Sequence, residues 1–141
     1  MPTLGATMSG WNHKQEWKKP GTNFAIVVSR HEVDAGIPYY EQGKYRWCVY
    51  AYIYPKHWLF TMFDKALGMF EQPTDDMPLH WGVSFFQAHE CDGVVTSYQV
   101  GCDYNHLHDN HYTFIETESE ASSIFNDAMR LFDYLKSEVQ P

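Results

Sequence analysis

The sequence lacks three features that would assign it to a common functional class. No apolar run approaches the length of a membrane span, and the first residues show no secretory leader. The three cysteines have no Cys-x-x-Cys spacing. Only 10 Lys and Arg oppose 18 Asp and Glu, a formal charge of −8 that disfavours an electrostatic grip on DNA or RNA. We therefore expect no membrane association, no direct nucleic-acid binding and a location in a reducing cytoplasm.

The length and the hydrophobic content indicate one folded domain. The chain has 141 residues, of which 44% are hydrophobic, enough to fill a core. Residues 1–21 are polar, without a periodic apolar pattern, and are predicted to form a flexible N-terminal tail that Trp11 and Trp17 can hold to the body. Residues 22–141 are predicted to form a single α+β domain.

Four runs of β-forming residues predict strands. Residues 24–29 and 45–54 are rich in Val, Ile, Tyr and Trp, and the second run is the strongest strand signal in the chain. Residues 80–88 and 94–102 flank an Asp-Gly pair, which favours a tight hairpin turn. The runs therefore predict a sheet with a hairpin near its middle.

Two segments have helical spacing. Residues 58–67 predict a short helix, and residues 118–138 carry apolar side chains at a period near 3.6. Thr117 and Glu120 have the spacing of a capping box at the start of the longer helix. The simplest arrangement is a mostly antiparallel sheet of four or more strands with the C-terminal helix packed on one face.

The chemistry-bearing residues gather where the hairpin ends. A turn at Asp92 and Gly93 places His80 on the same face as Asp103, with His106 and Asp109 following the strand. A carboxylate beside an imidazole fixes its tautomer and raises its basicity, which prepares a general base. We predict His80, Asp103, His106 and Asp109 as catalytic residues of a hydrolase or phosphoesterase. The alternative is that the two aspartates only organise a loop by Asx turns.

Neighbouring residues are predicted to bind a ligand. Gly82 and Gly101 would leave a shallow hollow beside the histidines, and Ser84 is a small polar residue on the same face. His57 follows a strand that we expect to end near His80. Tyr52 belongs to a tyrosine-rich strand face that suits stacking on a base or sugar.

A metal site is a narrower hypothesis for the same loop. His106 and His108, with Asp103, offer the nitrogen and oxygen donors that divalent metals accept. Their spacing matches no standard metal signature, so the satisfied-loop interpretation is preferred. The sequence identifies no other cofactor.

Three motifs resemble a family of small uncharacterised proteins encoded by bacteriophages and prophages. The motifs are YIYPKHWLF, MPLHWGVSFF and GCDYNHLHD, against family patterns close to PxxHPLF, HGGxTF and GxDxxHxGD before a C-terminal helix. By position the resemblance points to His57, His80, Gly82, Asp103, His106 and Asp109. The chain departs from the pattern at Trp58, where proline is usual, and at Trp81 and His108, where glycine is usual. The resemblance implies a phage origin rather than a particular reaction.

Two functions follow as hypotheses. The first is a small phage-type protein of the host cytoplasm whose His/Asp pocket binds a phosphate-bearing or nucleotide-like small molecule, with hydrolysis as an option, to counter host defence. The second is a non-enzymatic acidic protein that inhibits a host defence or nucleic-acid-processing complex through exposed acids such as Asp76, Asp127 and Asp133. The oligomeric state is left open.

Overall fold

A five-stranded antiparallel sheet carries the fold in the computed structural model, which describes Trp11 and residues 15–33, 42–66, 76–106 and 108–137. Along the chain lie β1 Glu16–Pro20, β2 Phe24–Glu32, β3 Tyr45–Ile53, α2 Trp58–Ala66, β4 Phe85–Cys91, β5 Val94–Asp103, the 3₁₀ turn η1 Asn110–Phe114 and α4 Ser122–Leu135. The strand order is β1-β2-β3-β5-β4. The predicted α+β class is confirmed.

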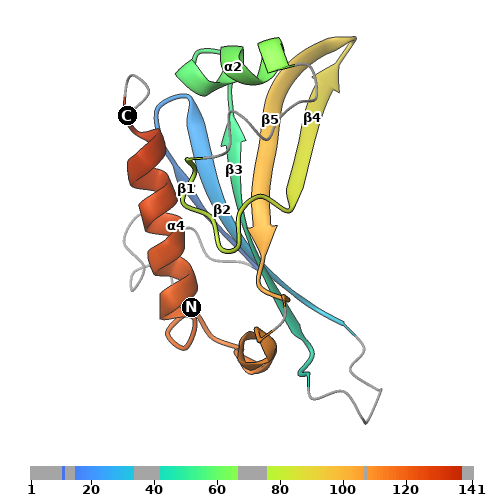
Figure 1. Cartoon of the computed structure of the whole chain (residues 1–141), viewed down its shortest axis with the longest axis vertical. Coiled ribbons are helices and arrows are strands. Elements are labelled where there is room, and N and C mark those ends of the chain that lie inside the picture. Colours follow the sequence, from blue (N-terminus) through green and yellow to red (C-terminus); the bar gives the residue numbers. More distant parts are fainter. Residues whose placement is uncertain (1–10, 12–14, 34–41, 67–75, 107, 138–141) are drawn as a thin grey trace.

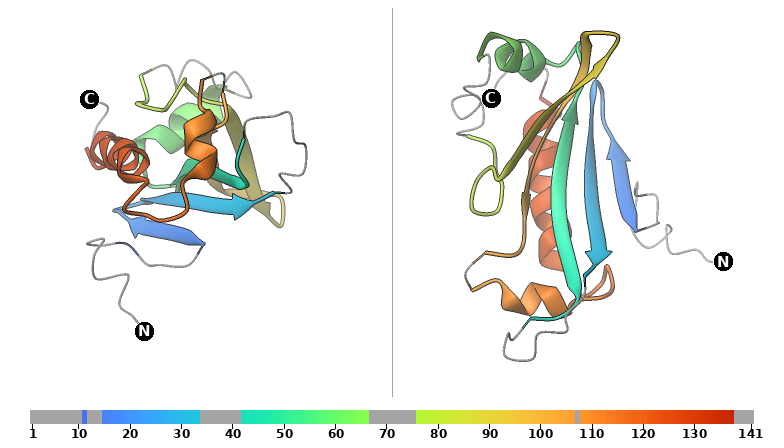
Figure 2. Two further views of the ribbon diagram at one scale, coloured as in Figure 1. Left: turned by 90° about the horizontal axis from the view of Figure 1, so that it is seen from below. Right: turned by 90° about the vertical axis from the view of Figure 1, so that its right-hand side faces the viewer.

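The helices cover one face and one end of this sheet. Helix α4 runs along one face, and α2 lies across the end at which β3 finishes (Figure 1). The turned views show the opposite face without a covering helix and η1 at the other end of the sheet (Figure 2). No helix in the described ranges is long and apolar enough to cross a membrane.

An aromatic cluster joins the sheet to α4. Trp17 of β1 and Trp47 of β3 stack with ring centroids 5.5 Å apart, and Phe125 of α4 meets both rings edge-on at 5.6 and 6.2 Å. All three side chains are buried. Such contacts add to the apolar area that the rings bury, so the N-terminal strand is part of the core.

The tail prediction is therefore wrong for residues 16–20. Glu16–Pro20 pairs with β2 as the edge strand β1, because burial of Trp17 outweighs the polar composition around it. Trp11 is also buried, against Phe125 at 5.3 Å. Residues 1–10 and 12–14 of the predicted tail lie outside the described residues.

The predicted hairpin turn is present at Asp92 and Gly93. Their φ angles are 53° and 80°, the positive values that this kind of turn needs. The pair beside the turn, Cys91 with Val94, has the predicted register. The Asp-Gly pair alone is therefore enough to predict where the hairpin turns.

The predicted register is wrong further along the hairpin. A bulge shifts the pairing by one residue between His89 and Glu90, and Phe85 then lies opposite Gly101. Side chains alternate along a strand, so one extra residue exchanges the two faces of β4. Phe86, not Phe85, consequently packs against the core.

The capping box is formed as predicted. The backbone N–H of Glu120 donates to Thr117 Oγ1, and the N–H of Thr117 donates to Glu120 Oε1, each at 3.3 Å. The Thr117 hydroxyl, which donates to Glu120 Oε1 at 2.9 Å, and the Thr117 N–H hold the pKa of Glu120 below its usual value. They close one turn ahead of α4, which begins at Ser122 and not at residue 118.

Truncation of Trp17 tests the place of β1 in the core. We expect Trp17→Ala to lower the free energy of unfolding by about 3–5 kcal/mol, the usual cost of removing a large buried aromatic. The exposed neighbour Lys18, changed to Ala, should alter it by less than about 0.5 kcal/mol. Urea unfolding followed by circular dichroism gives both values, and similar small losses in both variants would show that β1 is dispensable.

Candidate functional site

One buried carboxylate, Asp109, holds two imidazoles. His80 Nε2 lies 3.1 and 3.0 Å from the two Asp109 oxygens, and His106 Nδ1 lies 3.1 Å from Oδ2. The backbone N–H of His106 also donates to Oδ2, at 2.9 Å. The Asp109 side chain is only 5% exposed, so the charge has hydrogen-bond donors in place of solvent.

Two local turns bring these side chains together. Asp109 follows β5 in a turn in which its N–H donates to the carbonyl of His106 at 2.9 Å. His80 lies in a second turn, in which the N–H of Gly82 donates to the carbonyl of Leu79 at 3.0 Å. His80 therefore precedes β4, and the prediction that it belongs to the strand is wrong.

A clamp of aromatic rings fixes the His80 imidazole. The ring stacks on Tyr104, with centroids 4.4 Å apart and planes 14° apart. Tyr112 meets the His80 ring edge-on at 5.7 Å. Tyr104 is itself held by its hydroxyl, which donates to Asp127 Oδ2 of α4 at 2.7 Å. Burial and this carboxylate raise the pKa of Tyr104, which keeps its hydroxyl protonated and donating.

His106 lies in the middle of the cluster. Its Nδ1 faces Asp109, and its Nε2 lies 3.5 Å from Asp103 Oδ1. Its side chain is 22% exposed and that of Asp103 is 47% exposed, so this edge of the imidazole reaches solvent. The structure thus brings together all four predicted catalytic residues, with His106 and not His80 beside Asp103.

The hydrogen bonds assign a tautomer to each ring. A carboxylate only accepts, so in the neutral rings His80 carries its proton on Nε2 and His106 carries its proton on Nδ1. His106 Nε2 is then the basic atom that faces Asp103 and solvent. Burial raises the pKa of Asp109, but the bonds from His106 and His80 outweigh it and hold that pKa below the usual value. Asp109 consequently remains an anion.

The same cluster contains a plausible donor set for a metal. The ligand atoms of His80, His106 and Asp109 lie within 4.8 Å of one another, and two imidazoles with one carboxylate form a known set for transition metals. It differs from the predicted set, because His108 is exposed outside this group and Asp103 faces the other nitrogen of His106. The residues present fit a divalent metal of the zinc or iron type.

The predicted hollow at Gly101 is absent. A Cβ at this position would collide with the carbonyl of Val49 and the ring of Tyr50, so the Tyr50 side chain already fills the space. Ser84 instead supports the cluster, since its Oγ accepts the backbone N–H of Asp103 at 3.3 Å. Gly82 has φ +81°, and the space beside it is open.

Tyr52 lies on the opposite face of the sheet from the His80 ring. It pairs with Gln99 and stacks on His89 at 6.0 Å, on the face that α4 does not cover. Burial raises its pKa. Nothing in this placement connects Tyr52 with the histidine cluster.

His57 is at the other end of the sheet, and the expectation that it adjoins His80 is wrong. Strands β3 and β4 both run antiparallel to β5, so the end of β3 and the start of β4 lie far apart. His57 Nε2 donates to the carbonyl of Leu135 at 2.8 Å, and Nδ1 accepts the N–H of Leu59 at 3.1 Å. Both ring nitrogens are engaged, so His57 ties α2 to α4.

Trp81 contacts the cluster, although the sequence analysis did not include it among the candidate site residues. Its indole stacks on the His106 ring, with centroids 5.3 Å and planes 7° apart, yet it is 64% exposed. Its φ of 62° is unusual for a bulky side chain. The sequence offered two signals for it: the glycine that follows marks a turn, and Trp81 stands where the family pattern has glycine.

Comparison with family models, with curated proteins and with solved structures gives no match. The meaning of the site therefore follows from its own geometry.

Substitution of Asp109 tests the role of its charge. A folded-state pKa below the unfolded value means that the carboxylate stabilises the fold above about pH 4 and that this contribution is lost as pH falls through the folded pKa. We expect Asp109→Asn to cost about 1–3 kcal/mol at pH 5, with the gap to wild type narrowing toward pH 3. Urea unfolding across this range, with the half-exposed Asp103→Asn as control, checks it. A gap independent of pH would contradict it.

His57 gives a second pH prediction. Burial lowers the pKa of His57, although the bond to the Leu135 carbonyl raises it in part. The unfolded chain then binds a proton more readily, so the folded state loses stability as pH falls below about 6.5. We expect His57→Gln to flatten this slope between about pH 7 and 5, whereas exposed His31→Gln should leave it. An unchanged slope in His57→Gln would assign the pH dependence to other groups.

Proposed function

We propose that the His/Asp cluster of His80, Asp103, His106 and Asp109 binds a phosphate-bearing or other polar small molecule. The observation that carries this proposal is the buried Asp109, which accepts bonds from both imidazoles and from a backbone N–H. The two imidazoles and the backbone N–H donate to the buried carboxylate, and these bonds hold each ring in one rotamer. Imidazoles held in place in this way favour binding, because little conformational freedom is lost when the ligand arrives.

The exposed edge of His106 is the proposed contact with the ligand. An imidazole can donate to a phosphate oxygen when it is protonated, and His106 Nε2 already lies beside the half-exposed Asp103. The outward face of Trp81 offers a flat surface next to it. Base–aromatic stacking is tolerant of base identity, which favours a nucleotide-like ligand over a bare anion.

Hydrolysis of a phosphoester is the reaction that this arrangement suits. With Nε2 unprotonated, His106 would accept the proton of the attacking water as the water oxygen bonds to phosphorus and the ester P–O bond breaks. Asp109 holds the resulting imidazolium at Nδ1, and His106 Nε2–H would then return the proton to the leaving oxygen. Asp103 lies 3.5 Å from the same nitrogen and accepts a hydrogen bond from it only when Nε2 is protonated. Sequestration of the ligand without reaction uses the same contacts.

The phage assignment is also part of the proposal. Trp81 and His108 replace glycines of the family pattern, and they adopt φ of 62° and 74°. Glycine reaches such angles without the steric cost of a Cβ, so the backbone at both positions supports the resemblance. A phage-type protein in the host cytoplasm could remove or hold a nucleotide signal of host defence.

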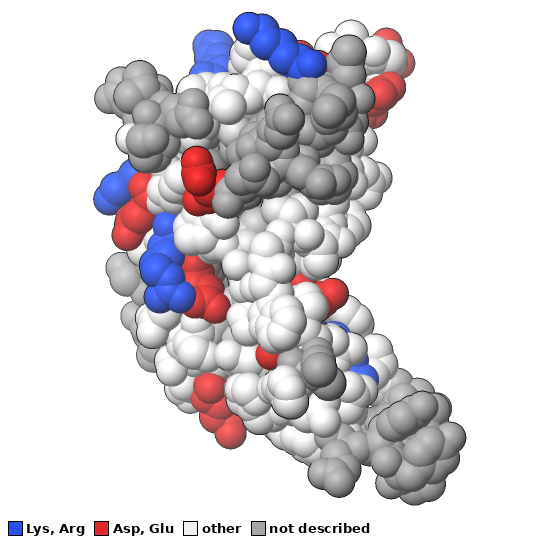
Figure 3. Space-filling model, viewed as in Figure 1, with Lys and Arg blue, Asp and Glu red and all other residues white. Residues whose placement is uncertain are grey.

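The alternative of an acidic inhibitor has less support. Asp127 accepts the Tyr104 hydroxyl and pairs with Arg130, and Asp133 pairs with Lys136 at 3.4 Å. Positive and negative side chains consequently alternate along the side that α4 forms (Figure 3). An imitation of DNA needs a continuous negative surface, which this helix face does not provide.

Substitution of His106 tests the proposal. Titration calorimetry with adenosine monophosphate should give saturable binding to the wild type, and His106→Gln should weaken it at least about tenfold, the loss expected for a charge-assisted hydrogen bond. The matched control is His89→Gln, because His89 bonds to Gln99 on the uncovered face of the sheet. Thermal melting of both variants reports any structural loss.

Three results would decide against the proposal. Equal binding of adenosine monophosphate by the His106 and His89 variants would show that the cluster does not contact the ligand. A large drop in melting temperature for His106→Gln, without nucleotide binding by the wild type, would make the cluster structural. Zinc binding without nucleotide binding would make it a metal site alone.

A further inference from the structure

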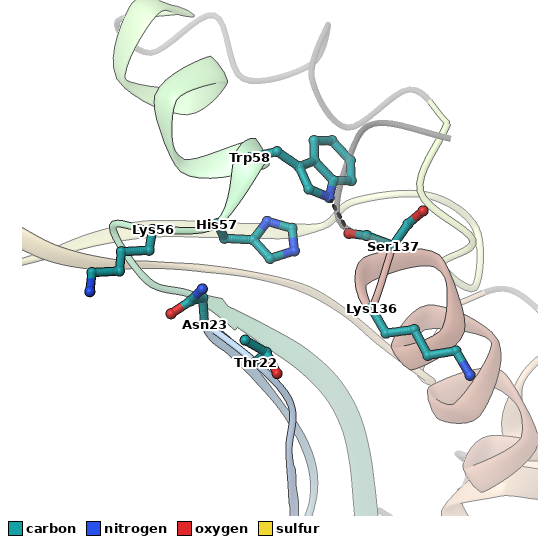
Figure 4. Close-up of a pocket in the computed structure, with 7 residues that line it drawn as sticks. All are labelled: Thr22, Asn23, Lys56, His57, Trp58, Lys136 and Ser137. Carbon is teal, nitrogen blue, oxygen red and sulfur yellow. Dashed lines mark hydrogen bonds between the residues drawn. The ribbon is translucent and has the colours of Figure 1, made fainter.

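A cleft lies at the end of the sheet opposite the His/Asp cluster. It has a volume of about 440 Å³ and is formed where the β1–β2 turn, the start of α2 and the end of α4 meet (Figure 4). Sites for small ligands fall in the range of about 300–1,000 Å³. The cleft is therefore large enough for a nucleotide-sized molecule.

The charge of the cleft is opposite to that of the chain. Two of its lining residues, Lys56 and Lys136, are basic and none is acidic, in a chain with a formal charge of −8. Lys56 has no ion-pair partner among the residues that the structure describes, and Lys136 has only the exposed Asp133, at 3.4 Å. An exposed pair of this kind is weak and exchanges readily.

The two lysines lie on opposite sides of the cleft. Their side chains extend outward, with the two ammonium groups pointing away from each other, and Asn23 lies on the β1–β2 turn beside the cleft (Figure 4). Thr22 adds a hydroxyl from the same turn. Long lysine stems can bring the ammonium groups over a ligand, while the turn supplies neutral donors below it.

The wall between the lysines is held in place by hydrogen bonds. His57 Nε2 donates to the Leu135 carbonyl at 2.8 Å, and Trp58 Nε1 donates to the Ser137 carbonyl at 2.9 Å. The Leu135 carbonyl belongs to the last residue of α4, and Ser137 follows the helix, so both lie at the end where the helix dipole disfavours an anion. The two bonds offset part of this effect, and the rings of His57 and Trp58 form one side of the cleft.

We propose that this cleft binds a small phosphorylated molecule, with Lys56 and Lys136 contacting the phosphate groups. Asn23 and Thr22 donate to the same groups, and the ring of Trp58 contacts the remainder of the ligand. The site is independent of the His/Asp cluster, because the two lie at opposite ends of α4.

Calorimetry on the full chain with pyrophosphate, adenosine diphosphate and adenosine tests this site. We expect saturable binding of the two phosphorylated probes and none of adenosine. Lys56→Gln and Lys136→Gln should each weaken pyrophosphate binding at least about tenfold. Lys18→Gln, which makes the same charge change at an exposed position of β1, should leave it within about twofold of wild type. His106→Gln should leave the pyrophosphate affinity unchanged.

Three outcomes would overturn the proposal. Equal weakening by the Lys18, Lys56 and Lys136 variants would indicate attraction by net charge without a site. Binding of adenosine as tight as that of adenosine diphosphate would show that phosphate is not what the cleft recognises. Loss of pyrophosphate binding in His106→Gln, with Lys56→Gln unaffected, would assign the anion to the His/Asp cluster instead.

Discussion

The packing of Trp17 and Trp47 against Phe125 determines how the rest of the molecule is arranged. These rings join the edge strand, a central strand and α4, and so fix the helix along the sheet. Near the start of α4, Asp127 then receives the Tyr104 hydroxyl beneath the His80 ring. At its end the Leu135 carbonyl receives His57. Both candidate sites therefore depend on how α4 is placed on the sheet.

Much of the fold could be predicted because its signals are local. The Asp92-Gly93 turn and the Thr117–Glu120 capping box each need only a few adjacent residues, and both are formed. The bulge between His89 and Glu90 could not be predicted, because no turn residue marks it. The strand at residues 16–20 could not be predicted, because Lys and Pro are poor strand formers and the burial of Trp17 appears only in the folded structure.

The sequence predicts which residues form the cluster, but it does not predict which carboxylate bonds to which imidazole. The closeness of Asp103, His106 and Asp109 in the sequence placed them in one loop, and a hairpin had to bring His80 back to it. Which carboxylate meets which imidazole depends on the turn at residues 79–82, in which Trp81 has a positive φ. That turn also puts an exposed indole against His106, a contact that no periodicity predicts.

The bulge in the hairpin has a consequence for association between molecules. Strands β1 and β4 are the two outer strands of the sheet, and an open, flat edge is a template for another chain. The bulge twists the β4 edge out of a regular ladder. At the other edge, β1 carries Lys18 and Lys19 and ends at Pro20, which has no N–H to give. Neither border of the sheet thus offers a long, regular row of free backbone groups for a neighbouring strand to extend.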